Sequence, residues 1–460
     1  MLELQPHQRV HFIGIGGAGL SAIARILLER GYSVSGSDLK GGPLTAALSA
    51  DGARVFVGHE ASYVQGADIV LATSAAPPDH VEILAAQALG IPVYRRKDFM
   101  GAILRDGDTI AVAGTHGKTT TTSMIIHILK CAGKDPSFIV GGALANWGAN
   151  AGVGSGPSFV IEADEYDNMF HGLNPALAVI TNVEHDHPDF FETPAQMRAA
   201  FKTFVGTLAP GGSLIACAED AAARSIADEY RATGGKATTY GISNQTADWR
   251  AADLRFDGEL VTASIWRHGC RCAQFELSLP GAHNALNALA ALVAASERGV
   301  SPEESAQALE SFRSTARRFE IRGERDGLIV IDDYAHHPTE IRVNIEAARL
   351  RYPERELWAV WQPHTYSRIR QFWSGFISAF DGADNVVITP IYAAREEALD
   401  GVNSPALAEA MADHGGAVYA PTFDDAAEIL RRGVIAPAVV LIFSAGDANQ
   451  IADLVLGGDA

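Results

Sequence analysis

The sequence has few cysteines and few basic side chains for its size. Its four cysteines (Cys131, Cys217, Cys270 and Cys272) have neither the spacing of a zinc site nor the number of a disulfide framework, so we expect reduced thiols. The 36 lysines and arginines are outnumbered by 55 aspartates and glutamates, which gives a net charge of −19. This acidic balance argues against sequence-independent binding to nucleic acid or to an anionic membrane.

Long hydrophobic runs are missing as well. No segment approaches the roughly 18 apolar residues of a transmembrane helix, and no basic-then-apolar segment precedes the first expected strand. We therefore expect a cytoplasmic protein without a membrane partner. What is plentiful is glycine (45 residues) and hydrophobic side chains (47%), as is typical of a loop-rich α/β protein. The length of 460 residues favours about three domains.

The segment 110–122 carries the strongest chemical signal. An apolar strand, residues 110–113, runs into Gly114-Thr-His-Gly-Lys-Thr-Thr, and an apolar helix follows. A tight turn before a helix directs backbone N–H groups and the positive end of the helix dipole at one point, and Lys118 adds a full charge, so this turn suits a polyphosphate. Thr119 is placed to bind a magnesium ion. Val112 occupies the first glycine position of G-x-x-x-x-G-K-[ST], so the match is to a variant.

A second glycine-rich turn lies near the start of the sequence, between a strand at 10–15 and a helix at 21–29. Its members are Gly14, Gly16, Gly17, Ala18 and Gly19, and an acidic residue, Asp38, ends the next strand. This pattern is typical of an NAD-dependent oxidoreductase. The unit is short, however, with single further strands at 68–74 and 91–94, and no acid or base for hydride transfer is evident. The alternative is a grip on the diphosphate of a nucleotide-linked substrate, with Asp38, His59 and Ser74 either contacting uridine or ribose or merely capping loops.

Polar residues follow several further strands. Glu162 ends the strand 159–162 and begins an acidic cluster, and His187 follows the strand 178–181 among acids; both suit a magnesium site, and His187 could instead stabilise an oxyanion. A zinc site is not favoured, because no third and fourth ligands follow. Asn284 and Asn287 share one helical face and could contact adenine or ribose or cap the helix.

The last segment, from about residue 313, reads as another doubly wound sheet. Strands at 328–331, 357–361, 386–388 and 439–443 end in polar residues, which marks the ligand-binding edge of such a sheet. Arg317 and Arg318 are placed to reach a nucleotide phosphate, and His364 with Arg368 forms a plausible carboxylate grip. Because this segment has no phosphate loop, we expect it to bind the acceptor substrate.

Together these motifs resemble those of the Mur ligases of peptidoglycan synthesis, in the family's order. The matching segments are His11–Gly19, Gly114–Thr120, Glu162–Glu165, Asp186–Asp189, His283–Asn287, Arg317–Glu320, Asp332–Glu340 and Gln362–Arg368. The resemblance implies an α/β chain of three domains: a Rossmann-like UDP-substrate domain (1–106), a P-loop ATPase domain with a mostly parallel sheet (107–312) and a Rossmann-like amino-acid domain (313–460).

The resemblance also implies roles for individual residues. It places ATP at Gly114, Thr115, His116, Gly117, Lys118, Thr119, Thr120, Asn284, Asn287, Arg318 and Asp333. It places Mg²⁺ at Thr119, Glu162 and His187, with Lys118, Glu162 and His187 serving catalysis. It places the amino acid near Tyr334, His336, His364 and Arg368. Several members carry a carbamylated lysine, and whether Lys202 has that role stays open.

The implied activity is the ATP-dependent joining of L-alanine to the lactyl carboxylate of UDP-N-acetylmuramate through an acyl phosphate, in cytoplasmic cell-wall precursor synthesis. Leu20 and Ala335 replace a methionine and a glycine common in the family, and the form Glu162-Ala-Asp-Glu-Tyr-Asp also occurs in a ligase that attaches a whole tripeptide to the same sugar. That salvage reaction and the NAD-dependent oxidoreductase remain alternatives. We expect small-molecule substrates only and a monomer or homodimer.

Overall fold

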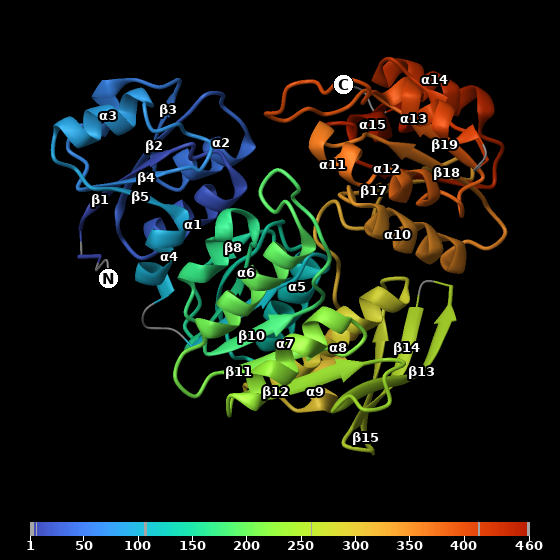
Figure 1. Ribbon diagram of the computed structural model, residues 1–460, viewed down its shortest axis with the longest axis horizontal. Coiled ribbons are helices and arrows are strands. Elements are labelled where there is room, and N and C mark those ends of the chain that lie inside the picture. Colours follow the sequence, from blue (N-terminus) through green and yellow to red (C-terminus); the bar gives the residue numbers. More distant parts are fainter. Residues whose placement is uncertain (1–3, 6, 105–107, 259, 413–414, 458–460) are drawn as a thin grey trace. The chain divides into compact units, whose positions relative to one another are not determined.

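The computed structural model describes residues 4–5, 7–104, 108–258, 260–412 and 415–457 (Figure 1). It divides into two compact units. The first contains Met1–Val183, Arg198–Arg250 and Leu289–Ala308, and the second contains Glu184–Met197, Ala251–Ala288 and Leu309–Ala460. The expected domain boundary at residues 106 and 107 lies outside the described residues.

The N-terminal part of the first unit is a five-stranded parallel sheet in the order β3-β2-β1-β4-β5. Its strands are β1 (Arg9–Ile13), β2 (Ser33–Asp38), β3 (Arg54–Val57), β4 (Ile69–Ala72) and β5 (Val93–Arg95). Its helices are α1 (Ala18–Glu29), α2 (Pro43–Ala50), α3 (Val81–Ala88) and α4 (Arg96–Leu104), with a 3-10 helix η1 (Ala61–Val64). The expectation of a short unit was wrong, because β3, α2 and α3 complete a doubly wound sheet.

The phosphate-loop segment forms the centre of a second sheet. Strand β6 (Asp108–Ala113) pairs in parallel with β10 (Leu177–Ile180) on one side and β9 (Ser158–Glu162) on the other, and α5 (Lys118–Cys131) follows it. The sheet continues through β11 (Ser213–Cys217) and β12 (Lys236–Gly241) at one edge and β7 (Ser137–Ile139) and β8 (Ala151–Gly152) at the other. Strand β6 is buried from Thr109 onward, and its residues 110–113 are all apolar, as is typical of a central parallel strand.

Further helices belong to this part of the chain: η2 (Tyr166–Gly172), α6 (Pro194–Gly206), α7 (Ala221–Ala232), α8 (Ala282–Ser296) and α9 (Pro302–Glu310). Three more strands follow β12 and precede α8: β13 (Trp249–Asp257), β14 (Leu260–Arg267) and β15 (Cys270–Leu277). Strands β14 and β15 pair antiparallel, whereas β13 pairs in parallel with β12 at Trp249 and Arg250.

The C-terminal sheet has the order β16-β17-β21-β18-β19-β20. The strands are β16 (Glu320–Arg325), β17 (Leu328–Asp333), β18 (Glu356–Trp361), β19 (Asn385–Ile388), β20 (Val418–Tyr419) and β21 (Ala438–Phe443). The helices are α10 (Pro338–Arg351), α11 (Tyr366–Gln371), α12 (Trp373–Ser378), α13 (Ser404–Ala410), α14 (Phe423–Gly433) and α15 (Gln450–Leu456). Asp333 and Trp361 are both in register with Phe443, so the polar residues that end these three parallel strands share one edge.

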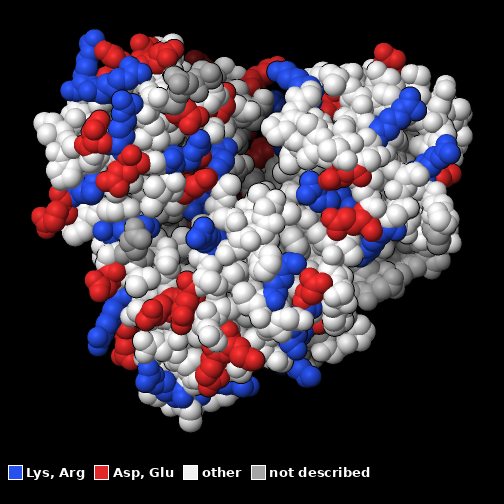
Figure 2. All heavy atoms as spheres, turned by 180° about the vertical axis from the view of Figure 1, so that it is seen from behind, with Lys and Arg blue, Asp and Glu red and all other residues white. Residues whose placement is uncertain are grey.

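Acidic and basic side chains are interspersed over the face drawn in Figure 2. The four cysteines, all of which lie in the described part of the chain, form no disulfide bond; Cys217 is buried, and Cys131 and Cys270 are exposed. Among the described helices, none is long and apolar enough to cross a membrane.

Candidate active site

The turn between β6 and α5 has a backbone that only glycine accommodates at two points. Gly114 has a φ of +147°, and a Cβ there would overlap the Thr181 hydroxyl. Gly117, which precedes the first residue of α5, is left-handed with a φ of +79°. These two glycines let the chain turn tightly into the helix, so the helix N-terminus opens at the end of a buried strand, where an anion is favoured.

The end of β10 holds this turn in place. The Asn182 Oδ1 accepts from the His116 N–H at 2.8 Å, and the Asn182 Nδ2 donates to the His116 carbonyl at 3.1 Å. The Thr181 hydroxyl donates to the same carbonyl at 2.6 Å. Sequence reasoning missed both residues, because the only signal is that Thr181 ends the strand 178–181 and Asn182 follows it.

Lys118 is held by the loop and by a buried acid. Its Nζ donates to the carbonyls of Gly114 (2.5 Å) and Thr115 (3.1 Å) and pairs with Glu165 Oε1 at 2.8 Å. Burial alone would lower the pKa of Lys118, but the facing Glu165 carboxylate outweighs it, so the pKa is raised above its ordinary value. Lys118 is therefore a fixed cation at the helix N-terminus. The sequence offered Glu165 only as one member of an acidic cluster; the structure shows it buried.

Thr119 and Glu162 meet as the sequence predicted. The Thr119 hydroxyl donates to Glu162 Oε1 at 2.9 Å, and Glu162 Oε2 accepts from the Gly141 N–H at 2.6 Å. A hydroxyl and a carboxylate at the mouth of a phosphate loop are hard oxygen donors, which fit Mg²⁺. His187, the third expected ligand, belongs to the second unit.

The N-terminal glycine turn is closed by an acid. The Asp38 Oδ2 accepts from the Gly16 N–H at 2.8 Å, and a Cβ at Gly16 would lie 2.9 Å from that same oxygen. Gly14 has a φ of +83°, while Gly17, Ala18 and Gly19 run into the start of α1. Asp38 thus fastens the turn, which is the loop-capping role that the sequence left open. Ser74 is exposed beyond the end of β4.

His59 belongs to a network that the sequence did not predict. Its Nδ1 lies 2.8 Å from Glu82 Oε1, and Glu82 is fully buried. His11 Nε2 lies 2.7 Å from Glu82 Oε2, and the Ser37 hydroxyl donates to both carboxylate oxygens. No pattern of spacing relates these residues, since they lie on β1, on β2, after β3 and on α3.

In the second unit, Arg368 forms a buried ion pair with Asp186. The Arg368 Nε lies 2.9 Å from Asp186 Oδ1, and both side chains are nearly inaccessible. Arg368 also donates from Nη1 to His364 Nδ1 at 3.0 Å, and its Nη2 lies 3.5 Å from His187 Nδ1. Burial alone would raise the pKa of Asp186, but the guanidinium holds it well below its ordinary range. The predicted grip residues His364 and Arg368 therefore meet.

Tyr334 and His336 join this cluster. The rings of His336 and His364 are 5.5 Å apart, and those of Tyr334 and His336 are 5.3 Å apart. Burial, reinforced by Arg368, lowers the pKa of His336 to about 3 and that of His364 to about 4. Both rings are therefore neutral at pH 7, and Arg368 is the cation of the cluster.

The junction before β16 is tied to the end of β17. The two oxygens of Asp333 accept from the N–H groups of Phe319 and Ala335, each at 2.7 Å. Arg317 and Arg318 both lie over the Tyr334 ring, 5.3 Å from its centroid. Burial raises the pKa of Asp333 to about 6, although Arg318 opposes this. Asp333 thus positions the segment that carries Arg318.

The two predicted amides meet at the start of α8. The Asn284 Nδ2 donates to the Pro280 carbonyl at 2.7 Å, and the Asn287 Nδ2 donates to Asn284 Oδ1 at 3.4 Å. Asn284 therefore fastens the helix entry, one of the two roles its spacing allowed. Lys202 pairs with Glu229 at 2.6 Å on the surface.

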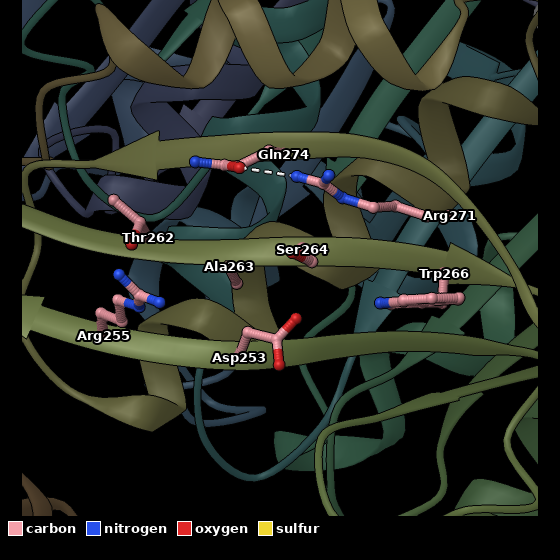
Figure 3. A pocket seen from close by; sticks show the side chains of 8 residues that line it. All are labelled: Asp253, Arg255, Thr262, Ala263, Ser264, Trp266, Arg271 and Gln274. Atoms are coloured by element: carbon pink, nitrogen blue, oxygen red, sulfur yellow. Dashed lines mark hydrogen bonds between the residues drawn. The ribbon is translucent and has the colours of Figure 1, made fainter.

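A separate depression of about 390 Å³ lies over β13, β14 and β15 (Figure 3). Its lining includes Arg255, Trp266 and Arg271, and Arg271 donates to Gln274. None of the residues predicted for ATP, UDP-substrate or amino-acid binding lines it.

Comparison with known proteins assigns the class. Three models match in series: "Mur ligase family, catalytic domain" over residues 9–107, "Mur ligase middle domain" over 112–295 and "Mur ligase, glutamate ligase domain" over 317–446. The protein is an ATP-using, amide-bond-forming ligase and belongs to the Mur ligase family. This confirms the expected family, enzyme class and three-domain α/β architecture, and it removes the NAD-dependent oxidoreductase.

Individual members of the family are similar to this chain over nearly its whole length. The chain is 42% identical over 451 residues to the UDP-N-acetylmuramate–L-alanine ligase of Acidithiobacillus ferrooxidans, covering 97% of this chain and 96% of that one. It is similar to the crystal structure of UDP-N-acetylmuramate–alanine ligase from Thermotoga maritima (TM-score 0.83, 29% identity, 98% and 99% covered). It is also similar to a murein peptide ligase from Psychrobacter arcticus (TM-score 0.71, 26% identity, 98% of each chain).

Proposed function

We propose that the protein joins L-alanine to the lactyl carboxylate of UDP-N-acetylmuramate at the expense of ATP, in the cytoplasmic synthesis of peptidoglycan precursors. The observation that carries this assignment is the 42% identity, over 97% of the chain, to a ligase named for that reaction. The geometry supports this assignment. The phosphate loop, the oxygen donors Thr119 and Glu162, and the buried Arg368 are the kinds of groups that such a reaction needs.

The chemical problem is that a carboxylate does not acylate an amine in water without activation. In the proposed reaction the lactyl carboxylate attacks the γ-phosphate of ATP, which forms an acyl phosphate and releases ADP. The alanine amine then attacks the acyl carbon, and inorganic phosphate leaves from the tetrahedral intermediate. Lys118 and the N–H groups of residues 114–120 bind the triphosphate and offset the charge on the transferring phosphoryl group.

The metal belongs to this proposal. The family resemblance assigns Thr119, Glu162 and His187 to Mg²⁺, which when bound would supply charge neutralisation at the phosphates. The other expected nucleotide contacts are Asn284, Asn287, Arg318 and Asp333. The nucleotide contact of Arg318 is supported by the hydrogen bonds of Asp333, which position the segment that carries Arg318. The side-chain hydrogen bonds of Asn284 support a helix-capping role at least as well as a nucleotide contact.

We assign the glycine turn of residues 14–19, with Asp38, His59 and Ser74, to the UDP end of the substrate, and Tyr334, His336, His364 and Arg368 to the amino acid. The domains are assigned accordingly: 1–106 to the UDP-substrate, 107–312 to ATP and 313–460 to the amino acid. We expect a monomer or homodimer, which light scattering after gel filtration would decide.

The test is phosphate release from ATP with UDP-N-acetylmuramate and one acceptor at a time: L-alanine, glycine, L-serine or the tripeptide L-alanyl-γ-D-glutamyl-meso-diaminopimelate. We expect the highest kcat/KM with L-alanine, and no release when either the sugar or the acceptor is omitted. A preference for the tripeptide would instead assign the salvage reaction. Phosphate release that needs no acceptor would contradict ligation.

A further inference from the structure

The buried carboxylate of Glu82 is the centre of a hydrogen-bond network that the proposed reaction does not by itself explain. Glu82 is 0% exposed and lies in the first turn of α3. A carboxylate has only acceptor sites, and three donors fill them: His59 at 2.8 Å, His11 at 2.7 Å and the Ser37 hydroxyl at 2.8 and 2.9 Å. A buried carboxylate is costly unless it is satisfied in this way.

Among the four residues of this network, His59 is the one whose side chain is partly exposed to solvent. His11, Ser37 and Glu82 are fully buried, and the second nitrogen of His11 is used by the Ser35 hydroxyl at 2.9 Å. His59 differs, because 23% of its side chain is exposed and its Nε2 makes no hydrogen bond within the described residues. The end of the network that can meet a ligand is therefore His59 Nε2.

The partners of His59 also decide which of its nitrogens carries the proton. Glu82 can only accept, so Nδ1 of His59 must donate to it. In the neutral ring Nε2 then has no hydrogen and can only accept. The hydrogen bonds from His11, Ser37 and His59 lower the pKa of Glu82 although burial would raise it, which keeps the acceptor ionised.

The fold places His59 at the same edge of the sheet as the glycine turn. His59 follows β3, whose Val57 is in register with Asp38 of β2, and Asp38 binds the N–H of Gly16. Ser37, which contacts both His59 and Glu82, precedes Asp38 on the same strand. His59 and the glycine turn thus both lie at the carboxyl edge of the N-terminal sheet, where doubly wound folds bind nucleotides.

We propose that Glu82, His11 and Ser37 are positioning residues that present His59 Nε2 as a hydrogen-bond acceptor for a donor on the uridine moiety of the substrate. This inference rests on the proposed function for the assignment of the glycine turn to a UDP-linked compound. It goes beyond that function by naming three buried residues and the protonation pattern through which they act.

The test uses a double-mutant cycle on the full chain. His59→Ala and Glu82→Gln are each expected to raise the KM for UDP-N-acetylmuramate about tenfold, with kcat and the KM for ATP unchanged. Because Glu82 acts through His59, the double variant is expected to match His59→Ala rather than to multiply the two effects. Glu60→Gln, at an exposed acid next to His59, is the matched control and should leave the KM unchanged.

Two measurements keep the result independent of folding and of turnover. Thermal melts report any loss of fold in Glu82→Gln; if that variant unfolds, His11→Gln takes its place in the cycle. Calorimetric titration with UDP alone measures the affinity of the site without ligation. A wild-type protein that binds UDP but does not ligate would contradict the proposed function and leave this inference intact.

Three outcomes would overturn the inference. The first is a normal KM and normal UDP affinity in His59→Ala. The second is full additivity of the two substitutions, which indicates a structural role for Glu82. The third is a metal ion in the purified protein that is lost in His59→Ala: His59, His80 and Glu82 have ligand atoms within 4.8 Å of one another, and a metal on Nδ1 would replace the proton that the network requires.

Discussion

Lys118 Nζ lies 2.8 Å from the buried carboxylate of Glu165. The two residues are 47 positions apart, and Glu165 holds the ammonium in the mouth of the phosphate loop before any nucleotide arrives. Such preorganisation means that binding does not have to order a long flexible side chain.

We expect Lys118→Ala to lose ATP-driven ligation by at least about three orders of magnitude, because the main positive side chain at the transferring phosphoryl group is removed. Phosphate release under saturating substrates measures this. Lys130→Ala, at the far end of the same helix, is the control and should remain active. Wild-type turnover in Lys118→Ala would contradict the role of the loop.

Glu165→Gln should change the pH dependence of ATP binding. The wild-type pKa of Lys118 is raised by Glu165 against the effect of burial, so the ammonium stays charged as the pH rises. Without Glu165, Asp164 and Glu162 still oppose the effect of burial but less strongly, so the pKa of Lys118 is expected to fall and the KM for ATP to increase as the pH rises above about 7. Asp167→Asn, in the same acidic cluster, should give a flat profile like the wild type.

Asn182→Ala tests the support of the phosphate loop. The side chain bonds both the N–H and the carbonyl of His116, so its loss removes one hydrogen bond from each group, although the carbonyl keeps the bond from the Thr181 hydroxyl. We expect the KM for ATP to rise about tenfold to a hundredfold, corresponding to about 1–3 kcal/mol for a buried polar group that loses a hydrogen bond. Asn182→Asp keeps the acceptor and should recover part of the loss; equal defects in both variants would argue against this account.

Arg368→Ala should impair both alanine binding and stability. The substitution removes the cation of the proposed amino-acid site and leaves Asp186 buried without its partner, which costs about 3–5 kcal/mol in typical proteins. We expect a higher KM for alanine, an unchanged KM for ATP and a lower melting temperature. Arg370→Ala, two residues further on and exposed, is the control. A normal KM for alanine would remove Arg368 from the site.

Asp333 should make stability depend on pH in a defined direction. Its pKa is raised to about 6, above its ordinary value of 3.8, so its protonated form is favoured in the folded state. That stabilising contribution is complete below about pH 4 and is lost as the pH rises through about 6. Asp333→Asn removes this titration, so the loss of stability of up to about 3 kcal/mol that the wild type shows between about pH 4 and pH 7 should be absent in the variant. The variant should be less stable than the wild type at low pH, because its Nδ2 cannot accept from the second backbone N–H. Urea unfolding across this range measures the difference.

The central, buried strands of the sheets were predicted well from the sequence, and the strands at the sheet edges were predicted poorly. Residues 110–113 of β6 and the whole of β21 are continuous apolar runs, so their burial on both faces is visible in their composition. Strand β3 has no fully buried residue, and its four residues are too few to show a periodic or continuous apolar pattern. Sheet edges are specified by pairing partners, which a single sequence does not reveal.

Some residues of the candidate site were predicted from the sequence, and others were not. Glycines, Lys118 and Glu162 were predictable because backbone geometry and phosphate chemistry limit which residue types can occupy a phosphate loop. Glu82, Glu165 and Asn182 were not, because each acts through a contact with a residue far away in the sequence. Glu82 meets His11 across 71 positions. The fold, rather than any local pattern, brings such residues into contact with the candidate site.

The ion pair between Asp186 and Arg368 joins residues 182 positions apart. At a translation rate of about 5–20 residues per second, Asp186 leaves the ribosome roughly ten to forty seconds before its counterion exists. During that interval the carboxylate has to stay hydrated, so the segment around it cannot reach its native burial until the C-terminal part of the chain has been made. A nascent chain stalled between the two positions would therefore be a sensitive substrate for proteases at this segment.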